Sequence, residues 1–218
     1  MITLQNEQLT VNLSALGAEL KSITNKVGFE FLWQANPAFW NKTSPILFPI
    51  VGSLKNNSYW YNNQEYKLNR HGFAREMLFD YQQTSATQVV FTLQDTDATL
   101  VNYPFSFQLQ VRYQLQGNQV TCTYLVTNTG VQNMLFSLGA HPAFALPELA
   151  NGSYYLAFNK DETLARYVLN TEGLVTNQTK NITLNHKTLP LTKPLFYDDA
   201  LVFKHLKSDC ITLKKYRK

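Results

Sequence analysis

Two of the histidines have neighbours that suit proton transfer or ligand binding, and the first is His71. It stands in RHGFAR (70–75), where Arg70 and Arg75 place two guanidinium groups near one imidazole. Arginine forks bind carboxylate, phosphate or paired hydroxyl groups, and Gly72 lets the backbone turn or approach a ligand closely. Taken alone, the stretch is better explained as a surface turn with solvated arginines, and ligand binding is the alternative.

The second is His141, in SLGAHPAFALP (137–147). The proline that follows it favours an extended backbone and removes a ladder donor. We therefore expect His141 where a strand leaves its sheet, a common place for site residues. A hydrogen-bonded core histidine is an equal alternative. His186 lies in the polar connection NHKT and His205 in FKHLK, on the solvent side of an expected strand. We expect both to be structural or surface residues.

Acidic candidates are confined to YDDALVF (197–203), where Asp198 and Asp199 precede an expected apolar strand. One of them could accept hydrogen bonds from a hydroxylated ligand. The sequence contains no nucleophile elbow, phosphate loop, dinucleotide-binding glycine pattern or zinc-ligand spacing. No cofactor or metal is therefore expected. Histidines, arginines, an aspartate and many aromatic residues fit a sugar site, where aromatic faces contact C–H surfaces and polar forks bind hydroxyls.

Composition limits the classes of partner. The formal net charge of the 218 residues is +4, and most of this excess lies in KKYRK (214–218), so no nucleic-acid partner is indicated. With 44% hydrophobic, 13% aromatic and 16% charged residues, the chain has a folded, β-type composition. No apolar run approaches the roughly 20 residues that span a bilayer. Together with the lack of a signal-peptide pattern, this predicts a cytoplasmic protein without a membrane partner.

Cysteine usage agrees with that compartment. Cys122 and Cys210 belong to no disulfide framework or metal spacing, and we expect both to be reduced, buried thiols.

The elements that must position these residues are strands. Apolar and polar residues alternate without a break from Phe105 to Gln116, Gly117-Asn118 supplies a hairpin turn, and the pattern resumes at 120–126. Further hairpins are predicted around Asn62-Asn63 and between 77–83 and 88–94, and a short helix at 36–40. The sequence predicts one all-β domain over 1–218, a large antiparallel β-sandwich.

Five stretches in order resemble bacterial galactose mutarotase-like proteins of the aldose 1-epimerase superfamily. They are FPIVGSLKNNSYWYNNQEYKL (48–68), RHGFAREMLFD (70–80), the long hairpin (105–126), SLGAHPAF (137–144) and LFYDDALVF (195–203). The resemblance implies a β-supersandwich and a cofactor-free interconversion of the α and β anomers of an aldose. In that reaction a base removes the C1 hydroxyl proton while an acid protonates the ring oxygen. The ring opens, the C1–C2 bond rotates and the ring closes again.

The resemblance also implies roles for single residues. His141 matches the family's catalytic acid, a task suited to a histidine whose ordinary pKa is about 6.5. His71 matches a histidine on the substrate side, and Asp199 matches an acid that holds sugar hydroxyls. Arg70 and Arg75 match positions at the ligand in related hexose-6-phosphate mutarotases. The implied partner is a small aldohexose or hexose phosphate, and self-association of the chain is a further expectation.

Two departures from the family pattern bear on activity. Ser53 stands where family members commonly carry arginine, and Lys55 is a partial substitute. The family's base is a glutamate near the end of a longer chain, whereas no glutamate follows Glu172 here. We therefore expect the domain to be incomplete at its C-terminus, with an exposed sheet edge that favours pairing with another chain.

Three readings of function follow. The first is an aldose 1-epimerase. The second is a non-catalytic or vestigial sugar-binding β-sandwich that lacks the base. The third is a purely structural sandwich with RHGFAR as a surface loop, which predicts that His71, Arg75 and His141 lie far apart.

Overall fold

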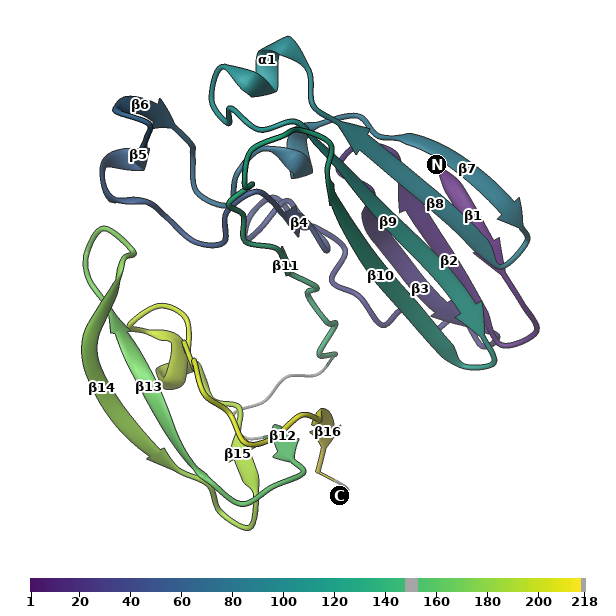
Figure 1. The fold of residues 1–218 in the computed structure, drawn as a ribbon. Helices are drawn as coiled ribbons and strands as arrows, with labels where there is room; N and C mark the ends of the chain where they lie inside the picture. The colour runs from purple at the N-terminus through teal and green to yellow at the C-terminus, as the bar shows by residue number, and fades with distance from the viewer. Residues whose placement is uncertain (148–152, 217–218) are drawn as a thin grey trace. The chain divides into compact units, whose positions relative to one another are not determined.

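The structure is a computed structural model that describes residues 1–147 and 153–216 (Figure 1). It consists mostly of antiparallel strands, so the all-β prediction is confirmed. The chain divides into two compact units, Met1–Ala145 and Leu146–Lys218, and each is described by itself. A single domain over 1–218 therefore stays a prediction. Within the described ranges, no helix has the length and apolar character needed to cross a bilayer.

The core of the first unit is formed mainly by two antiparallel sheets (Figure 1). One sheet has the order β1-β2-β3, and its strands are β1 (Ile2–Gln5), β2 (Leu9–Ser14) and β3 (Glu19–Asn25). The other has the order β10-β9-β8-β7, and its strands are β7 (Asp80–Ser85), β8 (Gln88–Gln94), β9 (Phe107–Gln116) and β10 (Gln119–Asn128). This arrangement confirms the predicted antiparallel sandwich.

Alternation along the strands explains how the two sheets form one core. Every second residue of β2 and β9 is buried, including Val11, Leu13, Leu109 and Val111, while the residues between them are more exposed. Successive side chains of a strand point to opposite faces, so each sheet has one apolar face. The Tyr113 hydroxyl spans the core by donating to the Ala18 carbonyl at 3.0 Å. The packed sandwich is the rigid base on which the loops of the candidate site are mounted.

The long hairpin is confirmed, with one difference at its start. Gln116 pairs with Gln119 around a turn in which Gly117 has φ +56°. The strand begins at Phe107, two residues later than the alternation predicted. The Phe107 N–H donates to the Asp95 carboxylate at 2.8 Å, and the Phe105 N–H donates to the Tyr103 carbonyl. These local bonds keep 105–106 out of the ladder.

Of the other local predictions, two hairpins are confirmed and one helix is wrong. The hairpins β5 (Ser58–Tyr61) with β6 (Gln64–Lys67), and β7 with β8, form where they were predicted. The predicted helix at 36–40 is wrong, because this stretch forms only a turn in which the Asn36 side chain accepts from the Ala38 N–H. The first unit also holds three short helical segments: η1 (Lys55–Asn57), η2 (Ala74–Glu76) and α1 (Asp97–Leu100).

A short central segment connects the sandwich to the site loops. Strand β4 (Ile46–Leu47) pairs with β11 (Gly139–Ala140), and Phe48 is fully buried among aromatic rings. The Glu19 carboxylate, 8% exposed, accepts from the N–H groups of Thr43 and Ser44 at 2.7 and 2.9 Å. A buried carboxylate with two backbone donors and a lysine partner is well satisfied. It fixes where the segment enters the core.

The second unit has two small antiparallel sheets. One has the order β15-β12-β16 and the other pairs β13 with β14; their strands are β12 (Tyr154–Phe158), β13 (Thr163–Leu169), β14 (Val175–Thr183), β15 (Thr188–Pro190) and β16 (Ile211–Lys215). A short helix, η3 (Lys193–Phe196), precedes the aspartate pair. The strand predicted from Ile211 is confirmed. Of the basic end at 214–218, Arg217 and Lys218 lie outside the described residues.

Two further expectations fail, one in this unit and one that concerns a cysteine in each unit. The apolar strand predicted after Asp199 is wrong: only Val202 forms an isolated bridge, with Tyr167. Cys122 and Cys210 are both free, as expected, but Cys210 is exposed and Cys122 only half-buried. Cys210 lies just before β16, outside the apolar cluster of this unit.

Replacing Gly72 tests how strongly the loop of His71 depends on the segment at 45–48. Gly72 has φ +69°, and an added Cβ would collide with the Phe48 carbonyl oxygen. We expect Gly72→Ala to lower the free energy of unfolding of the first unit by at least about 3 kcal/mol, from backbone strain plus a collision with backbone atoms.

The matched control is Gly28→Ala, because Gly28 has φ +79° with no atom within 4 Å of the added Cβ. It should cost only about 1 kcal/mol, from strain alone. Urea unfolding followed by tryptophan fluorescence reports on this unit, since Trp33, Trp40 and Trp60 all lie in it. Equal losses in the two variants would contradict the account.

Candidate functional site

The loops that carry His71 and His141 are both bonded to the segment at 45–48. The Pro45 carbonyl accepts from the His141 N–H at 3.1 Å. The Phe48 carbonyl accepts from the N–H groups of Phe73 and Ala74 at 3.0 and 3.1 Å. The loops of His71 and His141, which are distant in sequence, are therefore held by two carbonyls only three positions apart, those of Pro45 and Phe48.

This anchoring brings the two imidazoles together. The ring centroids of His71 and His141 lie 6.2 Å apart, with 30° between the ring planes. The structural-sandwich reading predicted that these residues lie far apart, and that prediction is wrong. In the sequence, His71 and His141 lie in two motifs about seventy residues apart, and no local pattern indicates that they are close in space.

His71 is held in a strained backbone conformation and between two donors. Its φ is +70°, and its N–H donates to the Gly52 carbonyl at 2.9 Å. The Gly52 N–H donates to ring atom Nδ1 at 3.0 Å, and Arg70 Nε donates to Nε2 at 3.2 Å. A neutral imidazole has only one nitrogen lone pair to offer, so these two bonds compete. Both donors oppose protonation of the ring.

Electrostatics reinforce the neutral form of both rings. Burial and the charges of Arg70, Arg75 and His141 lower the pKa of His71 from 6.5 to about 4. Burial and the same two arginines also lower the pKa of His141. Near neutral pH the pair is therefore uncharged and stands in the positive field of two guanidinium groups.

His141 has an aromatic neighbour that sequence reasoning missed as a site residue. The ring of Trp40 lies edge-on to the imidazole, with centroids 4.9 Å apart and an interplanar angle of 86°. The Trp40 carbonyl accepts from the indole N–H of Trp33 at 2.9 Å. Trp40 thus restricts the orientation of the His141 ring. Only its place at the end of the turn at 36–40 could have drawn attention to it.

The guanidinium of Arg75 is partly satisfied by the protein. Its Nη2 donates to the Arg70 carbonyl at 3.0 Å, which ties the two ends of RHGFAR together. Its Nε lies 3.6 Å from Glu76 Oε1 and is buried without a hydrogen-bond partner. Glu76 is itself engaged by Lys42 Nζ at 3.0 Å. Arg75 therefore keeps donor capacity.

The remaining candidates take no part in the contacts described above, and three of them belong to the second unit, which is described by itself. Asp199 lies in the second unit with φ +74°, and its carboxylate accepts from the Ala200 N–H. Ser53 follows Gly52, and Lys55 is exposed in η1. His186 and His205 are exposed in the second unit, as expected for surface residues. Among the described residues no cluster of His, Cys, Asp and Glu could hold a metal ion.

The first unit thus places two neutral imidazoles beside a surplus of N–H donors. Such a set can accept or deliver protons and can bind a ligand rich in oxygen acceptors or negative charge. His71, His141, Arg70 and Arg75 lie together in it, and their chemical roles remain proposals.

The pKa of His71 gives a prediction for stability. The folded protein takes up this proton near pH 4, whereas the unfolded chain takes it up near pH 6.5, so unfolding binds protons between these values. The stabilising effect is complete above pH 6.5 and is lost as the pH falls toward 4. We expect the urea midpoint of the first unit to fall over this range.

The variant His71→Asn should flatten that dependence, because asparagine tolerates positive φ and can still accept from the Gly52 N–H. His186→Asn is the control, since His186 also has positive φ (47°) but is exposed. An unchanged pH dependence in His71→Asn would contradict the assignment.

Comparison with known proteins agrees with the resemblance seen in the motifs. The model of the family described as Aldose 1-epimerase matches residues 1–216. The plasmid-encoded protein LacX of Lactococcus lactis subsp. lactis is 39% identical over 225 residues, which cover 98% of this chain and 75% of LacX. The chromosomal LacX of the same organism is 38% identical over the same share.

Solved structures agree as well. A galactose mutarotase related enzyme from Lactobacillus acidophilus superposes with a TM-score of 0.92 at 32% identity, over 98% of this chain and 73% of the other. A galactose mutarotase-like protein from Lactobacillus casei ATCC 334 gives a TM-score of 0.86 at 33% identity, over 91% and 70%. The motifs, the fold and these relatives lead to one conclusion: this chain belongs to the aldose 1-epimerase family.

Proposed function

We propose that this chain interconverts the α and β anomers of an aldohexose or hexose phosphate by acid–base ring opening, without a cofactor. The family is one of aldose 1-epimerases, and the similar Lactobacillus acidophilus protein is described as a galactose mutarotase related enzyme. The observation that carries the proposal is the imidazole pair, 6.2 Å apart and flanked by two arginines.

His141 is the proposed acid, and it acts in its protonated form, which is the minor form near neutral pH because burial and the two arginines lower its pKa. It gives a proton to the ring oxygen as the bond from C1 to that oxygen breaks, while the C1 hydroxyl loses its proton to a base and becomes the aldehyde. After rotation about C1–C2 the transfers run in reverse, so no proton is gained or lost overall. Trp40 holds the His141 ring edge-on during these transfers.

His71 is the proposed base. Its pKa of about 4 is close to the ordinary value of about 4.3 for a glutamate, the residue type that the resemblance assigns to this task. It is neutral near pH 7, and the competition between its two donors can free one ring nitrogen to accept a proton.

The non-catalytic alternative is favoured by the surroundings of two glutamates, the residue type that the resemblance assigns to the base. The last glutamate of the chain, Glu172, is exposed in the turn between β13 and β14, and Glu76 is engaged by Lys42. If His71 does not act as a base, the chain binds sugar without turning it over. This is the non-catalytic alternative.

Anomer exchange separates the two functions. We expect the 218-residue chain to accelerate the exchange of α-glucose or α-galactose above the buffer rate, measured by NMR exchange spectroscopy. His141→Asn and His71→Asn should each lower kcat/KM by about 10²–10⁴, while sugar binding persists. His205→Asn, an exposed histidine of the second unit, is the control. Binding without any acceleration would sink the enzyme proposal and leave the sugar-binding function.

A phosphorylated sugar tests the role of the arginines. An anionic group would offset the field of Arg70 and Arg75 and provide a charge-assisted acceptor for them. We expect Arg70→Gln to weaken hexose 6-phosphate binding by about 10- to 100-fold and free hexose binding less. Calorimetric titration measures both constants, with Arg112→Gln on the exposed face of β9 as the control. Equal losses for the two sugars would exclude a phosphate contact.

A further inference from the structure

We propose that two copies of this chain associate through β10, in antiparallel register about a two-fold axis at Thr123. Among the described residues no strand pairs with the outer edge of β10, which is the end strand of its sheet (Figure 1). An unpaired strand presents a row of backbone N–H and C=O groups to another strand. This edge is ten residues long and pairs with β9 without a bulge.

The composition of β10 lacks the features that normally prevent edge pairing. Its sequence, QVTCTYLVTN, has no charged residue and no proline, and is rich in β-branched residues. The opposite edge of the same sheet, β7, carries Asp80 and a register shift between Gln83 and Ser85. The Gln83 side chain and Ala86 also bond to β1 at 3.0 and 2.8 Å. One edge of the sheet is therefore protected and the other is open.

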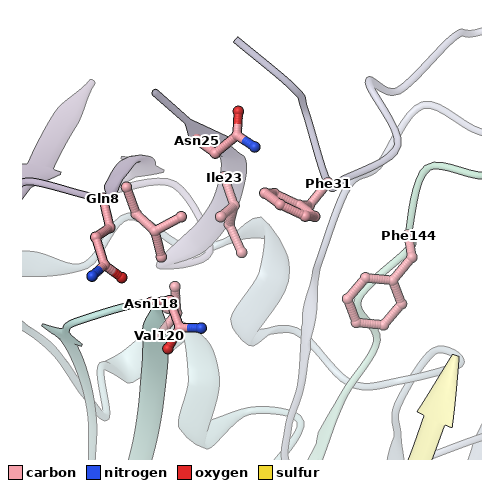
Figure 2. A pocket seen from close by; sticks show the side chains of 8 residues that line it. Gln8, Ile23, Asn25, Phe31, Asn118, Val120 and Phe144 are labelled. Carbon is pink, nitrogen blue, oxygen red and sulfur yellow. The ribbon is translucent and has the colours of Figure 1, made fainter. Parts of the chain in front are cut away.

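A hollow beside β10 gives the second observation. It has a volume of about 560 Å³ and lies beside β2, β3 and the start of β10. Figure 2 shows Val120 on one side of it and Ile23, Phe31 and Phe144 on the other. Phe31 and Phe144 are 38% and 54% exposed, so the sandwich is open to solvent along this side. A strand added to β10 would continue the sheet over this opening.

The faces of β10 determine how a second copy can pair with it. Val120, Cys122, Tyr124 and Val126 are half-buried and pack against the core, while the residues between them are exposed. Directly opposed residues of antiparallel strands lie on the same face of a sheet. Inward residues must therefore oppose inward residues, which places the axis on a residue and not between two.

The side chains favour Thr123 as that residue. An axis there sets Val120 of one copy opposite Val126 of the other, and Thr123 opposite Thr123. An axis at Tyr124 would set the half-buried Val120 opposite the exposed Asn128. Valine pairs and threonine pairs are favourable across strands. The pattern of β10 is thus nearly self-complementary about Thr123, and this is why a second copy is the expected occupant.

Charge does not oppose this pairing. Arg112 of β9 is the residue opposite Thr123 within one chain. In the paired assembly the two Arg112 residues would be three strand spacings apart, roughly 14 Å, which exceeds the screening length of about 8 Å at physiological ionic strength.

Sedimentation of the wild-type chain over a concentration series tests the proposal. We expect a monomer–dimer equilibrium without larger species. Thr123→Lys places two like charges opposite each other at the axis and should raise the dimer Kd at least about tenfold. Gln82→Lys, on the exposed face of β7, should leave it unchanged. Unfolding curves of the variants check that both remain folded.

Cross-linking tests the register. In a Cys210→Ser background, Thr123→Cys should form a disulfide-linked dimer, because opposed residues of antiparallel strands have Cα atoms about 4.5–5.5 Å apart, within the range of a disulfide. Gln82→Cys should not cross-link. A wild-type chain that stays monomeric, a Kd insensitive to Thr123→Lys, open-ended association, or cross-linking at Gln82→Cys alone would overturn the proposal.

Discussion

The candidate site depends on the hydrogen bonds of one short extended segment, residues 45–48. The Pro45 carbonyl holds the backbone of His141, and the Phe48 carbonyl holds the loop that follows His71. The segment is itself fixed from two sides, by the buried Glu19 carboxylate at its start and by the aromatic packing of Phe48 at its end. A shift of this segment would move both imidazoles relative to the sandwich. The close approach of Gly72 to the Phe48 carbonyl leaves little room for such a shift.

The charge distribution of the candidate site supports the proposed sugar ligand. Burial and two neighbouring guanidinium groups lower the pKa values of both histidines, so near neutrality the site holds neutral imidazoles beside guanidinium N–H donors. A polyhydroxylated ligand supplies acceptors for the donors and a hemiacetal for the imidazoles. The low pKa of His71 gives it the basicity of a carboxylate, which connects the electrostatics of the loop to the proposed ring opening.

The sequence predicted the parts of this structure that depend on local rules. Period-two alternation located β9 and β10, and Asn62-Asn63 adopts the positive φ that a tight hairpin requires. It failed where a few specific hydrogen bonds outweigh the pattern, as at 105–106 and in the turn at 36–40. The motifs identified His71 and His141, but their proximity arises from non-local bonds to Pro45 and Phe48 that no local pattern encodes. Trp40 was missed for the same reason, and Asp199 lies in a unit described separately.

The most direct test of the central claim, that His71 and His141 form one sugar site, is a long-range ¹H–¹⁵N spectrum of the histidine rings during titration with an aldose. We expect the ring nitrogens of His71 and His141 to shift together with one common Kd, while those of His186 and His205 do not move. Shifts of only one of the pair, or shifts with two different affinities, would contradict it.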